Sequence, residues 1–370
     1  MKTILTLSTF VLGICNATGQ ISGVVEKFAL PANLTESSGA IFYNDKLITH
    51  NDSGNENKLY ELDTISGSVT RTITISNATN TDWEDITQDD TSIYVGDIGN
   101  NSGNRTDLKI YKISKNDYIN STSVTAETIA FSYSDQTDFI ANLNNTEWDA
   151  EALVSFDATN LILFTKNWVT GITKGYLVPK TQGTYSLTPL TTTLTSGGLV
   201  AGGTYNSLTG KLYLVGYTSL LQPFVWVSES FSGNDVFSGT NTQTLLTSLG
   251  FEQTEGIAYV NENRYFVTSE SFSQIISDYA KLIAFSTNDT ALSINSNEIA
   301  NNVLYPNPVN DLLHISNEGI HAVEIYDMKL ARLYQGNDTQ IDMSRFGKGV
   351  YLIKIYLNND LPMIKRIVKK

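Results

Sequence analysis

Short runs of alternating apolar and polar residues, separated by polar turns, fill most of the first 286 positions, and no long stretch has helical periodicity. One pattern recurs. It consists of a first run of small or apolar residues, a polar turn, a second alternating run, a polar loop, and a third run rich in Tyr, Leu and Ile. Its five copies begin at Glu36, Glu84, Glu151, Ala201 and Glu255, at spacings of about 48, 67, 50 and 54 residues. Alternation with a period of two predicts strands with half-buried faces.

Repeats of this length are typical of β-propellers, in which each four-stranded blade packs only on its neighbours. Fourth strands are expected at 69–75 and 128–131, whereas the last copy has no obvious fourth strand. We therefore expect the N-terminal run, 21–30, to complete the last blade, so that no sheet edge stays exposed. The expected fold of 20–286 is all-β, a five-bladed β-propeller, or a six-bladed one if 233–247 holds a degenerate blade.

The pattern changes after Ser286. Residues 287–301 are polar and without periodicity, which is typical of a linker. Up to residue 300 there are 15 basic against 31 acidic residues, and from 301 onward there are 9 against 7. Short alternating runs then follow within 302–370, at 312–316, 322–328, 331–335, 339–343, 349–355 and 363–369. These runs predict a small Ig-like antiparallel β-sandwich.

Acidic residues stand at the entrance of the predicted innermost strands, which surround the central channel of a propeller. The residues expected at one mouth of that channel are Glu36, Glu84, Glu151, Glu255, Asp85 and Asp149. One interpretation is that they cap strand starts by accepting backbone N–H bonds, while Trp83 and Trp148 pack between blades. The other is a cation site, because gathered carboxylates repel one another unless they are protonated or neutralised by an ion such as Ca²⁺.

The loop after the second strand is also polar. It reads HNDSGN from His50 in the first copy and DIGNN from Asp97 in the next. Such residues form tight turns. Their oxygens also suit Ca²⁺, which makes Asp97 a further candidate ligand, although the spacing does not match an EF-hand loop. His50 and Asp52 are candidates for an acid/base pair.

Composition excludes several kinds of chemistry. His50 is the single histidine of 20–286, so a histidine-rich zinc or iron site is not available. No G-x-S-x-G, P-loop or G-x-G-x-x-G motif occurs. A hydrolase would have to use carboxylates, with or without a metal, which leaves Glu84, Glu151, His50 and Asp52 as catalytic candidates. A net charge of −14 argues against a nucleic-acid partner.

Residues 1–19 have the features of a secretory signal peptide: Lys2, an apolar run over 4–15, and small residues at 17–19. The apolar run is too short to span a bilayer, and no later one is longer. A lipoprotein anchored through Cys15 is the alternative. Cys15 is the only cysteine, so a chain cleaved before Gln20 contains no disulfide.

Several motifs of the first domain match a known group. The runs ESSG, THNDSGN, DWEDI, YVGDIGNN, WDAEAL and EGIAY, between residues 36 and 259, resemble secreted bacterial propellers of the SdiA-regulated type. More distantly, they are similar to phytase-like esterase and gluconolactonase propellers. The resemblance implies channel calcium on Glu36, Glu84, Glu151 or Glu255. The chain departs from the lactonase pattern at Ala201, where an acidic residue is usual, and it has no Glu-Gly-Pro opening.

The tail resembles a second family. YPNPV at 305–309, VEIYD at 323–327, GVYLIK at 349–354 and the basic end KRIVKK resemble the type A C-terminal sorting domain of the type IX secretion system of Bacteroidota. Lys329 stands where that family usually has glycine. The motif residues are Pro306, Asn307, Pro308, Gly349, Tyr351, Lys369 and Lys370. The resemblance implies the type IX machinery as a partner and secretion across the outer membrane, with the cargo released or attached to the cell surface.

Two functions follow as hypotheses. The first is a secreted or cell-surface binding module for a glycan, peptide or small molecule, with a Ca²⁺ site at the channel. The alternative is a Ca²⁺-dependent hydrolase of phosphate esters or lactones that uses the carboxylates of the channel mouth. Neither hypothesis calls for any cofactor besides Ca²⁺.

Overall fold

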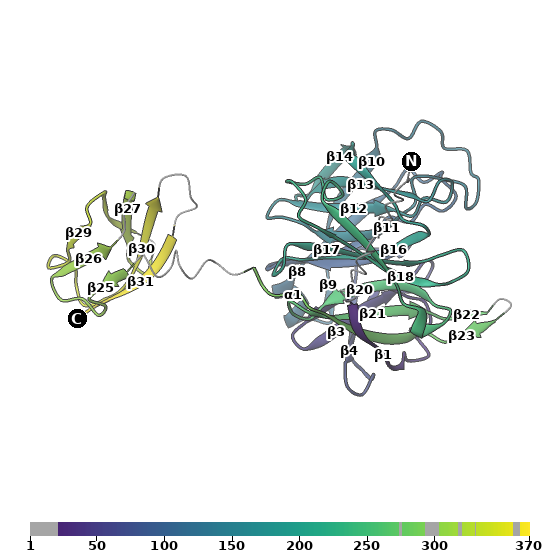
Figure 1. Cartoon of the computed structure of the whole chain (residues 1–370), viewed down its shortest axis with the longest axis horizontal. Helices are drawn as coiled ribbons and strands as arrows, with labels where there is room; N and C mark the ends of the chain where they lie inside the picture. Colours follow the sequence, from purple (N-terminus) through teal and green to yellow (C-terminus); the bar gives the residue numbers. More distant parts are fainter. Residues whose placement is uncertain (1–20, 274–275, 293–302, 317–319, 330, 358–362) are drawn as a thin grey trace, which may run out of the picture. The chain divides into compact units, whose positions relative to one another are not determined.

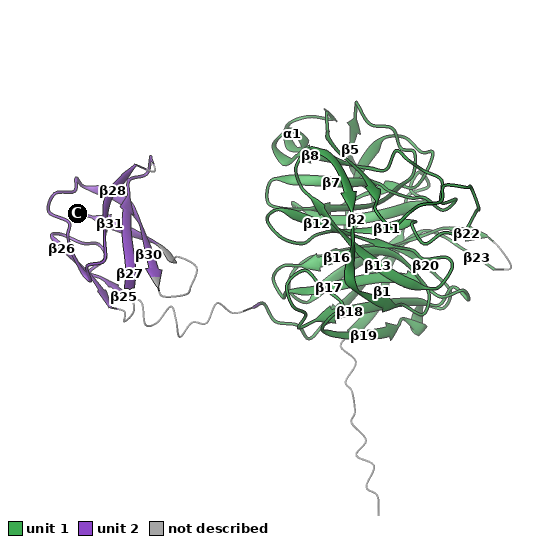
Figure 2. Cartoon of the chain, turned by 90° about the horizontal axis from the view of Figure 1, so that it is seen from above, with its two compact units in different colours: residues 1–291 green, residues 292–370 purple. Residues whose placement is uncertain are grey.

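The computed structural model describes residues 21–273, 276–292, 303–316, 320–329, 331–357 and 363–370 (Figure 1). The predicted signal peptide and residues 293–301 of the predicted linker lie outside the described residues. The chain divides into two compact units, Met1–Ala291 and Leu292–Lys370 (Figure 2). The predicted domain boundaries at 286 and 301 stay predictions.

Five sheets make up the first unit, and the strands of each follow one another outward from its first strand. The first sheet contains β2 (Ser37–Tyr43), β3 (Lys46–Asn51), β4 (Lys58–Asp63), β5 (Val69–Ile75) and β9 (Ser123–Val124). The second contains β6 (Trp83–Gln88), β7 (Ser92–Asp97), β8 (Lys109–Ser114), β10 (Glu127–Tyr133) and β14 (Gly183–Leu187). The third contains β11 (Ala150–Ser155), β12 (Asn160–Thr165), β13 (Ile172–Pro179) and β15 (Pro189–Thr195).

The fourth sheet contains β16 (Leu199–Asn206), β17 (Lys211–Tyr217), β18 (Pro223–Glu229) and β19 (Thr240–Leu245). The fifth contains β20 (Gln253–Tyr259), β21 (Arg264–Glu270), β24 (Lys281–Thr287) and β1 (Ile21–Ala29). Outside these sheets lie α1 (Lys115–Asn120), the 3₁₀ turn η1 (Thr247–Leu249), and a small hairpin of β22 (Phe272–Ser273) and β23 (Ser277–Asp278). The all-β prediction is confirmed.

The fifth sheet joins the two ends of the unit. Strand β1 pairs antiparallel with β24, so the expectation that the N-terminal strand completes the last sheet is confirmed. The segment 233–247, considered above as a degenerate blade, contributes β19 to the edge of the fourth sheet. Within the described residues it forms no sheet of its own.

The first strands of the five sheets contact one another in a cycle: β2 with β6, β6 with β11, β11 with β16, β16 with β20, and β20 with β2. A buried apolar cluster lies between each neighbouring pair of sheets. Trp83, for example, packs with Ile48 of the first sheet and Tyr111 of the second. Each sheet therefore buries both faces, which matches the alternation in its sequence.

The first strands approach so closely that glycine is required at their contacts. A Cβ on Gly202 would lie 1.8 Å from the carbonyl oxygen of Glu255, and one on Gly39 would lie 2.6 Å from the Cα of Asp85. Contacts this short exclude any side chain at these two positions. The glycines thus let the backbones of neighbouring sheets meet at the centre of the unit.

The second unit has two sheets that share one apolar core. One contains β25 (Val303–Tyr305), β26 (Leu312–Ser316) and β29 (Gln340–Asp342), and the other β28 (Arg332–Gly336), β27 (Ile320–Tyr326), β30 (Gly349–Leu357) and β31 (Met363–Lys369). The paired strands within each sheet are antiparallel. Each of the six predicted tail strands is present, with bounds shifted by at most two residues, whereas β25 was not predicted.

Candidate cation-binding site

Carboxylates gather where the first strands begin. A cavity of about 230 Å³, which we call the acidic pocket, is lined by six of them together with Lys166, Trp168, Tyr217 and other polar side chains. The six acidic residues are Asp52, Asp82, Glu84, Glu151, Glu255 and Glu270. They come from the first, second, third and fifth sheets.

The antiparallel pairing of the first two strands of each sheet explains why these residues meet. In such a pair the start of one strand lies opposite the end of the other. Glu84 stands at the second position of β6, and Glu151 at the second position of β11. Asp52 follows the end of β3, Lys166 follows β12, and Glu270 is the last residue of β21. Both kinds of position thus face the same mouth.

Each first strand also has a register irregularity near its start, for example between Trp83 and Asp85 on β6 and between Ala150 and Ala152 on β11. The same feature occurs on β2, β16 and β20. A bulge interrupts the simple alternation of a strand and redirects its side chains. It therefore decides which acidic side chain at a strand entrance reaches the pocket.

The pocket carries a surplus of negative charge. Lys166 is the one basic residue among its described lining residues, and its Nζ lies 3.1 Å from Oε1 of Glu151. The same ammonium lies over the rings of Trp168 and Tyr217, at 5.3 and 5.6 Å from their centroids. One lysine leaves most of the carboxylate charge uncompensated.

Burial and crowding weaken the acidity of these groups. Burial, followed by repulsion from Asp82, raises the pKa of Asp52 to about 7. Burial, followed by repulsion from Asp149, raises the pKa of Asp82 to about 6. Burial also raises the pKa of Glu255 to about 7 and that of Glu84 well above its usual range. Full ionisation near neutral pH therefore requires a compensating positive charge.

The oxygen positions suit a metal ion. Ligand atoms of Asp52, Asp82 and Glu84 lie within 4.8 Å of one another, and so do those of Glu84, Asp149 and Glu151. Glu84 belongs to both groups. Oε2 of Glu255 is buried and has no hydrogen-bond partner among the described residues. A donor set made only of oxygens fits a hard cation such as Ca²⁺.

Asp85, predicted for the same mouth, has the other predicted role. Its Oδ1 accepts a hydrogen bond from the backbone N–H of Ile86 at 2.8 Å. Its Oδ2 accepts from the backbone N–H groups of Leu153 at 2.8 Å and Gly203 at 3.1 Å. The buried Asp85 thus ties the first strands of three sheets together, and both of its oxygens are occupied.

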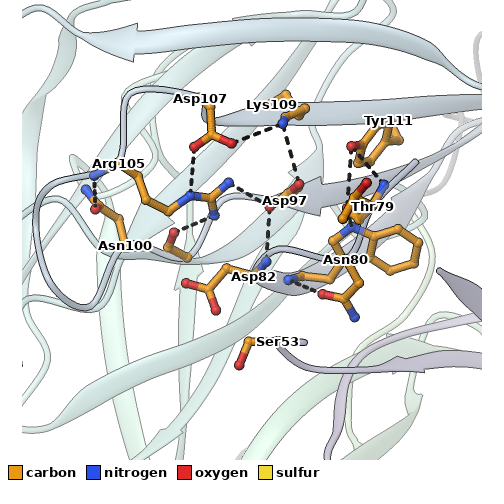
Figure 3. A network of polar contacts seen from close by, with 12 residues as sticks. Ser53, Thr79, Asn80, Asp82, Asp97, Asn100, Arg105, Asp107, Lys109 and Tyr111 are labelled. Carbon is orange, nitrogen blue, oxygen red and sulfur yellow. Dashed lines mark hydrogen bonds and ion pairs between the residues drawn. The ribbon is translucent and has the colours of Figure 1, made fainter. Parts of the chain in front are cut away.

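Asp149 and Asp97 are also engaged by the protein. The carboxylate of Asp149 accepts from the backbone N–H of Asn100 and, at 2.6 Å, from the indole N–H of Trp168. Figure 3 shows Asp97 between Arg105 and Lys109, whose nitrogens lie 2.8 and 3.8 Å from its carboxylate. Asp149 contributes to one of the two metal-compatible groups but also holds two loops together, whereas Asp97 does not line the pocket.

Glu36 and His50 do not line the acidic pocket either. Glu36 is exposed, and its Oε2 accepts from the side-chain amide of Asn55 at 2.6 Å. The His50 ring is buried edge-on against Trp83, with Nδ1 3.0 Å from the carbonyl oxygen of Asn51. Burial lowers its pKa to about 4, so the ring is neutral at physiological pH. This position gives no support to the predicted acid/base pair of His50 and Asp52.

Sequence reasoning did not name Asp82, Lys166 or Glu270 as site residues. A signal for two of them exists in the repeat itself, because Lys166 and Glu270 occupy the loop position after the second strand that Asp52 occupies in the first copy. Asp82 lies two residues before Glu84 and was visible in the DWEDI motif.

In the second unit, the predicted motif residues surround the last strand. The side-chain amide of Asn307 donates to the carbonyl oxygen of Arg366 and accepts from the N–H of Val368, both at 2.9 Å. The hydroxyl of Tyr351 donates to the carbonyl oxygen of Gly347 at 2.7 Å.

Lys329, where the resemblance suggests glycine, lies in a turn after β27. The carboxylate of Asp327 accepts from the backbone N–H groups of Lys329 and Ala331 at 2.9 Å each. This pair of bonds stabilises the turn with lysine in place.

Residues 303–370 match the model of the secretion system C-terminal sorting domain. The chain therefore carries a sorting domain of the type IX secretion system, and the tail prediction is confirmed. Proteins with this domain are exported across the outer membrane to the cell surface or the extracellular space, and this chain is such a cargo.

For the first unit the comparisons say less. No curated protein matches the chain. The crystal structure of a glucose dehydrogenase covers 73% of this chain and 100% of its own, with 8% sequence identity and a TM-score of 0.42, which carries no argument about function. Among the described residues, no helix is long and apolar enough to cross a membrane.

Proposed function

We propose that the first unit is a five-bladed β-propeller, exported as a type IX cargo, that acts as a binding module with a Ca²⁺ ion held in its acidic pocket. The cyclic contacts of the five first strands support the propeller, because a cycle of sheets around an axis produces this set of neighbours. The apolar cluster between each pair of sheets supports it as well. We further propose that the tail is an Ig-like sandwich.

The observation that carries the cation is the charge imbalance of the acidic pocket. Six carboxylates and one lysine line about 230 Å³, and an oxygen of Glu255 has no partner among the described residues. Ca²⁺ takes six to eight oxygen ligands at 2.3–2.6 Å and tolerates irregular geometry. Glu84, Asp52, Asp82 and Glu151 are the proposed ligands, and Lys166 limits the remaining charge.

The loops next to this pocket favour a binding role. Ile140 and Leu143, just before the pocket residue Asn144, are 79% and 66% exposed, and Leu220, shortly after Tyr217, is 76% exposed. Exposed apolar side chains gathered on neighbouring loops are typical of surfaces that contact a partner. A hydrolase that acts through a metal-bound water is the alternative, because the carboxylates provide ligands and a base.

A calcium titration tests the cation. The mature protein, stripped with EDTA, is titrated with Ca²⁺ at pH 7.5 by calorimetry, alongside Glu84→Gln and the matched control Glu36→Gln, which removes the same charge outside the pocket. We expect saturable binding to the wild type, at least tenfold weaker binding to Glu84→Gln, and no change for Glu36→Gln. Absence of binding to the wild type, or equal affinity in all three proteins, would contradict the proposal.

A panel of chromogenic phosphate esters and lactones separates the two functions. The binding module predicts no Ca²⁺-dependent turnover by the wild type. Turnover that disappears in both Glu84→Gln and Glu151→Gln would instead establish the hydrolase. Equal turnover in all three proteins would rule out catalysis by the acidic pocket.

A further inference from the structure

A second, larger cavity lies at the other ends of the first strands. Its volume is about 620 Å³, and we call it the distal pocket. Its wall comes from the last residues of β2, β6, β11, β16 and β20 and from the turns that follow them. The acidic pocket, in contrast, is built at the starts of the same strands.

The direction of the strands keeps the two pockets apart. Asp85 accepts from the N–H of Leu153, and two residues further along both strands Thr87 accepts from the N–H of Ser155, so β6 and β11 run the same way. The buried Asp85 and the close backbone contact at Gly39 lie between the residues that line the two cavities. The distal pocket is therefore a separate site.

Hydroxyl groups form part of its lining. Oγ1 of Thr87 accepts from the N–H of Ser155 at 3.0 Å, and Oγ of Ser155 accepts from Nζ of Lys180 at 2.8 Å. Neither hydroxyl hydrogen has an acceptor among the described residues, and the side chain of Thr204 makes no hydrogen bond there. Three neighbouring strands thus present hydroxyl donors to the cavity.

The cations of the distal pocket are already engaged. Nζ of the buried Lys180 lies 3.0 Å from Oδ2 of Asp89, which also accepts from the hydroxyl of Tyr94 at 2.8 Å. Nζ of Lys115 lies 4.2 Å from the centroid of the Tyr43 ring. The rim adds the exposed carboxylates of Asp90 and Asp157. This charge distribution disfavours phosphorylated and other anionic ligands.

Aromatic rings complete the wall. Phe42, Tyr43, Phe156, Tyr205 and Tyr259 line the cavity and are half-buried. Each also packs against one of the clusters between sheets, so part of each ring is fixed by the core while another part borders the cavity. Held rings give a ligand flat apolar surface at a low entropic cost.

We propose that the distal pocket binds a neutral saccharide. The C–H face of a sugar ring packs on aromatic rings, and its hydroxyls both accept from Thr87, Ser155 and Thr204 and donate to the rim carboxylates. The cavity volume lies within the range of small-ligand sites, about 300–1,000 Å³. This site gives the proposed binding module a ligand class, but it uses none of the residues of the acidic pocket.

Saturation-transfer NMR with the full mature chain tests this assignment. The probes are the neutral disaccharides maltose, cellobiose, lactose and mannobiose, with digalacturonic acid as the anionic comparison. The variants are Thr204→Val, which removes one hydroxyl at nearly constant shape, and Tyr259→Leu, which removes one ring. Glu84→Gln is the control in the acidic pocket, and melting curves confirm that every variant is folded.

We expect at least one neutral disaccharide to bind saturably, with or without EDTA. Its affinity should fall about fivefold to tenfold in Thr204→Val and further in Tyr259→Leu, and stay unchanged in Glu84→Gln. Three results would overturn the proposal: no neutral disaccharide binds at millimolar concentration, both distal variants bind as the wild type does, or digalacturonic acid binds more tightly. Saccharide binding without calcium binding would contradict only the cation site.

Discussion

Replacing Asp85 with asparagine tests the arrangement of the first strands. The carboxylate of Asp85 accepts three backbone N–H bonds, one each from the second, third and fourth sheets. Asparagine has the same shape but only one oxygen, so the amide keeps its oxygen toward Leu153 and Gly203 and turns its NH₂ group toward the N–H of Ile86. One bond is lost and two lose the help of a charge.

The size of the effect follows from these bonds. A hydrogen bond to a charged group contributes roughly 1.5–3 kcal/mol, and a buried N–H without a partner costs about 1–3 kcal/mol. Burial raises the pKa of Asp85, so removing the buried charge returns part of this loss. We therefore expect the free energy of unfolding of the first unit to fall by about 2–3 kcal/mol in Asp85→Asn.

Urea unfolding followed by tryptophan fluorescence measures this change, since all four tryptophans, Trp83, Trp148, Trp168 and Trp226, belong to the first unit. The control is Asp90→Asn, the same substitution at an exposed position, for which we expect a change below about 0.5 kcal/mol. If Asp85→Asn were as stable as this control, the view that one carboxylate joins three sheets would be wrong.

Three further predictions follow from the same structure. The raised pKa values of Asp52 and Glu255, each about 7, mean that the metal-free fold holds protons there. The stability that these protons maintain is complete below the ordinary carboxyl range and is lost as pH rises through about 7, so melting temperature in EDTA should fall from pH 5 to 8, and Ca²⁺ should restore it most at pH 8. Gly202→Ala should cost more than about 3 kcal/mol in urea unfolding, because its Cβ meets the carbonyl oxygen of Glu255, and stability equal to the wild type would refute that contact. Asn307→Ala should destabilise the second unit by about 1–3 kcal/mol, seen as faster hydrogen exchange at Val368; unchanged exchange would show that these bonds do not hold the last strand.

The strand arrangement was largely predictable because it rests on local patterns. Period-two alternation located the strands, and the missing fourth strand of the last repeat indicated that 21–30 would pair with the other end of the unit, as β1 does with β24. These inferences need only the burial of alternate residues and the avoidance of open sheet edges.

The roles of adjacent acidic residues were not predictable in the same way. Glu84 lines the pocket, whereas Asp85 binds backbone N–H groups 68 and 118 residues away in the chain. The bulge at the start of β6 and the contacts with other sheets decide between these roles, and neither is written in the local pattern. Glu36 shows the converse error: it aligns with Glu84, yet it lies outside the pocket, and Asp52 of the same sheet lines the pocket instead.

The most direct test of the proposed convergence of carboxylates on a cation is anomalous X-ray diffraction from crystals of the mature protein grown with Mn²⁺ in place of Ca²⁺. The account predicts an anomalous peak at the starts of β6 and β11, within coordination distance of carboxylate oxygens of Glu84 and at least two of its proposed co-ligands Asp52, Asp82 and Glu151. A saturating soak that gives no peak in the acidic pocket, or a peak only on other residues, would contradict it.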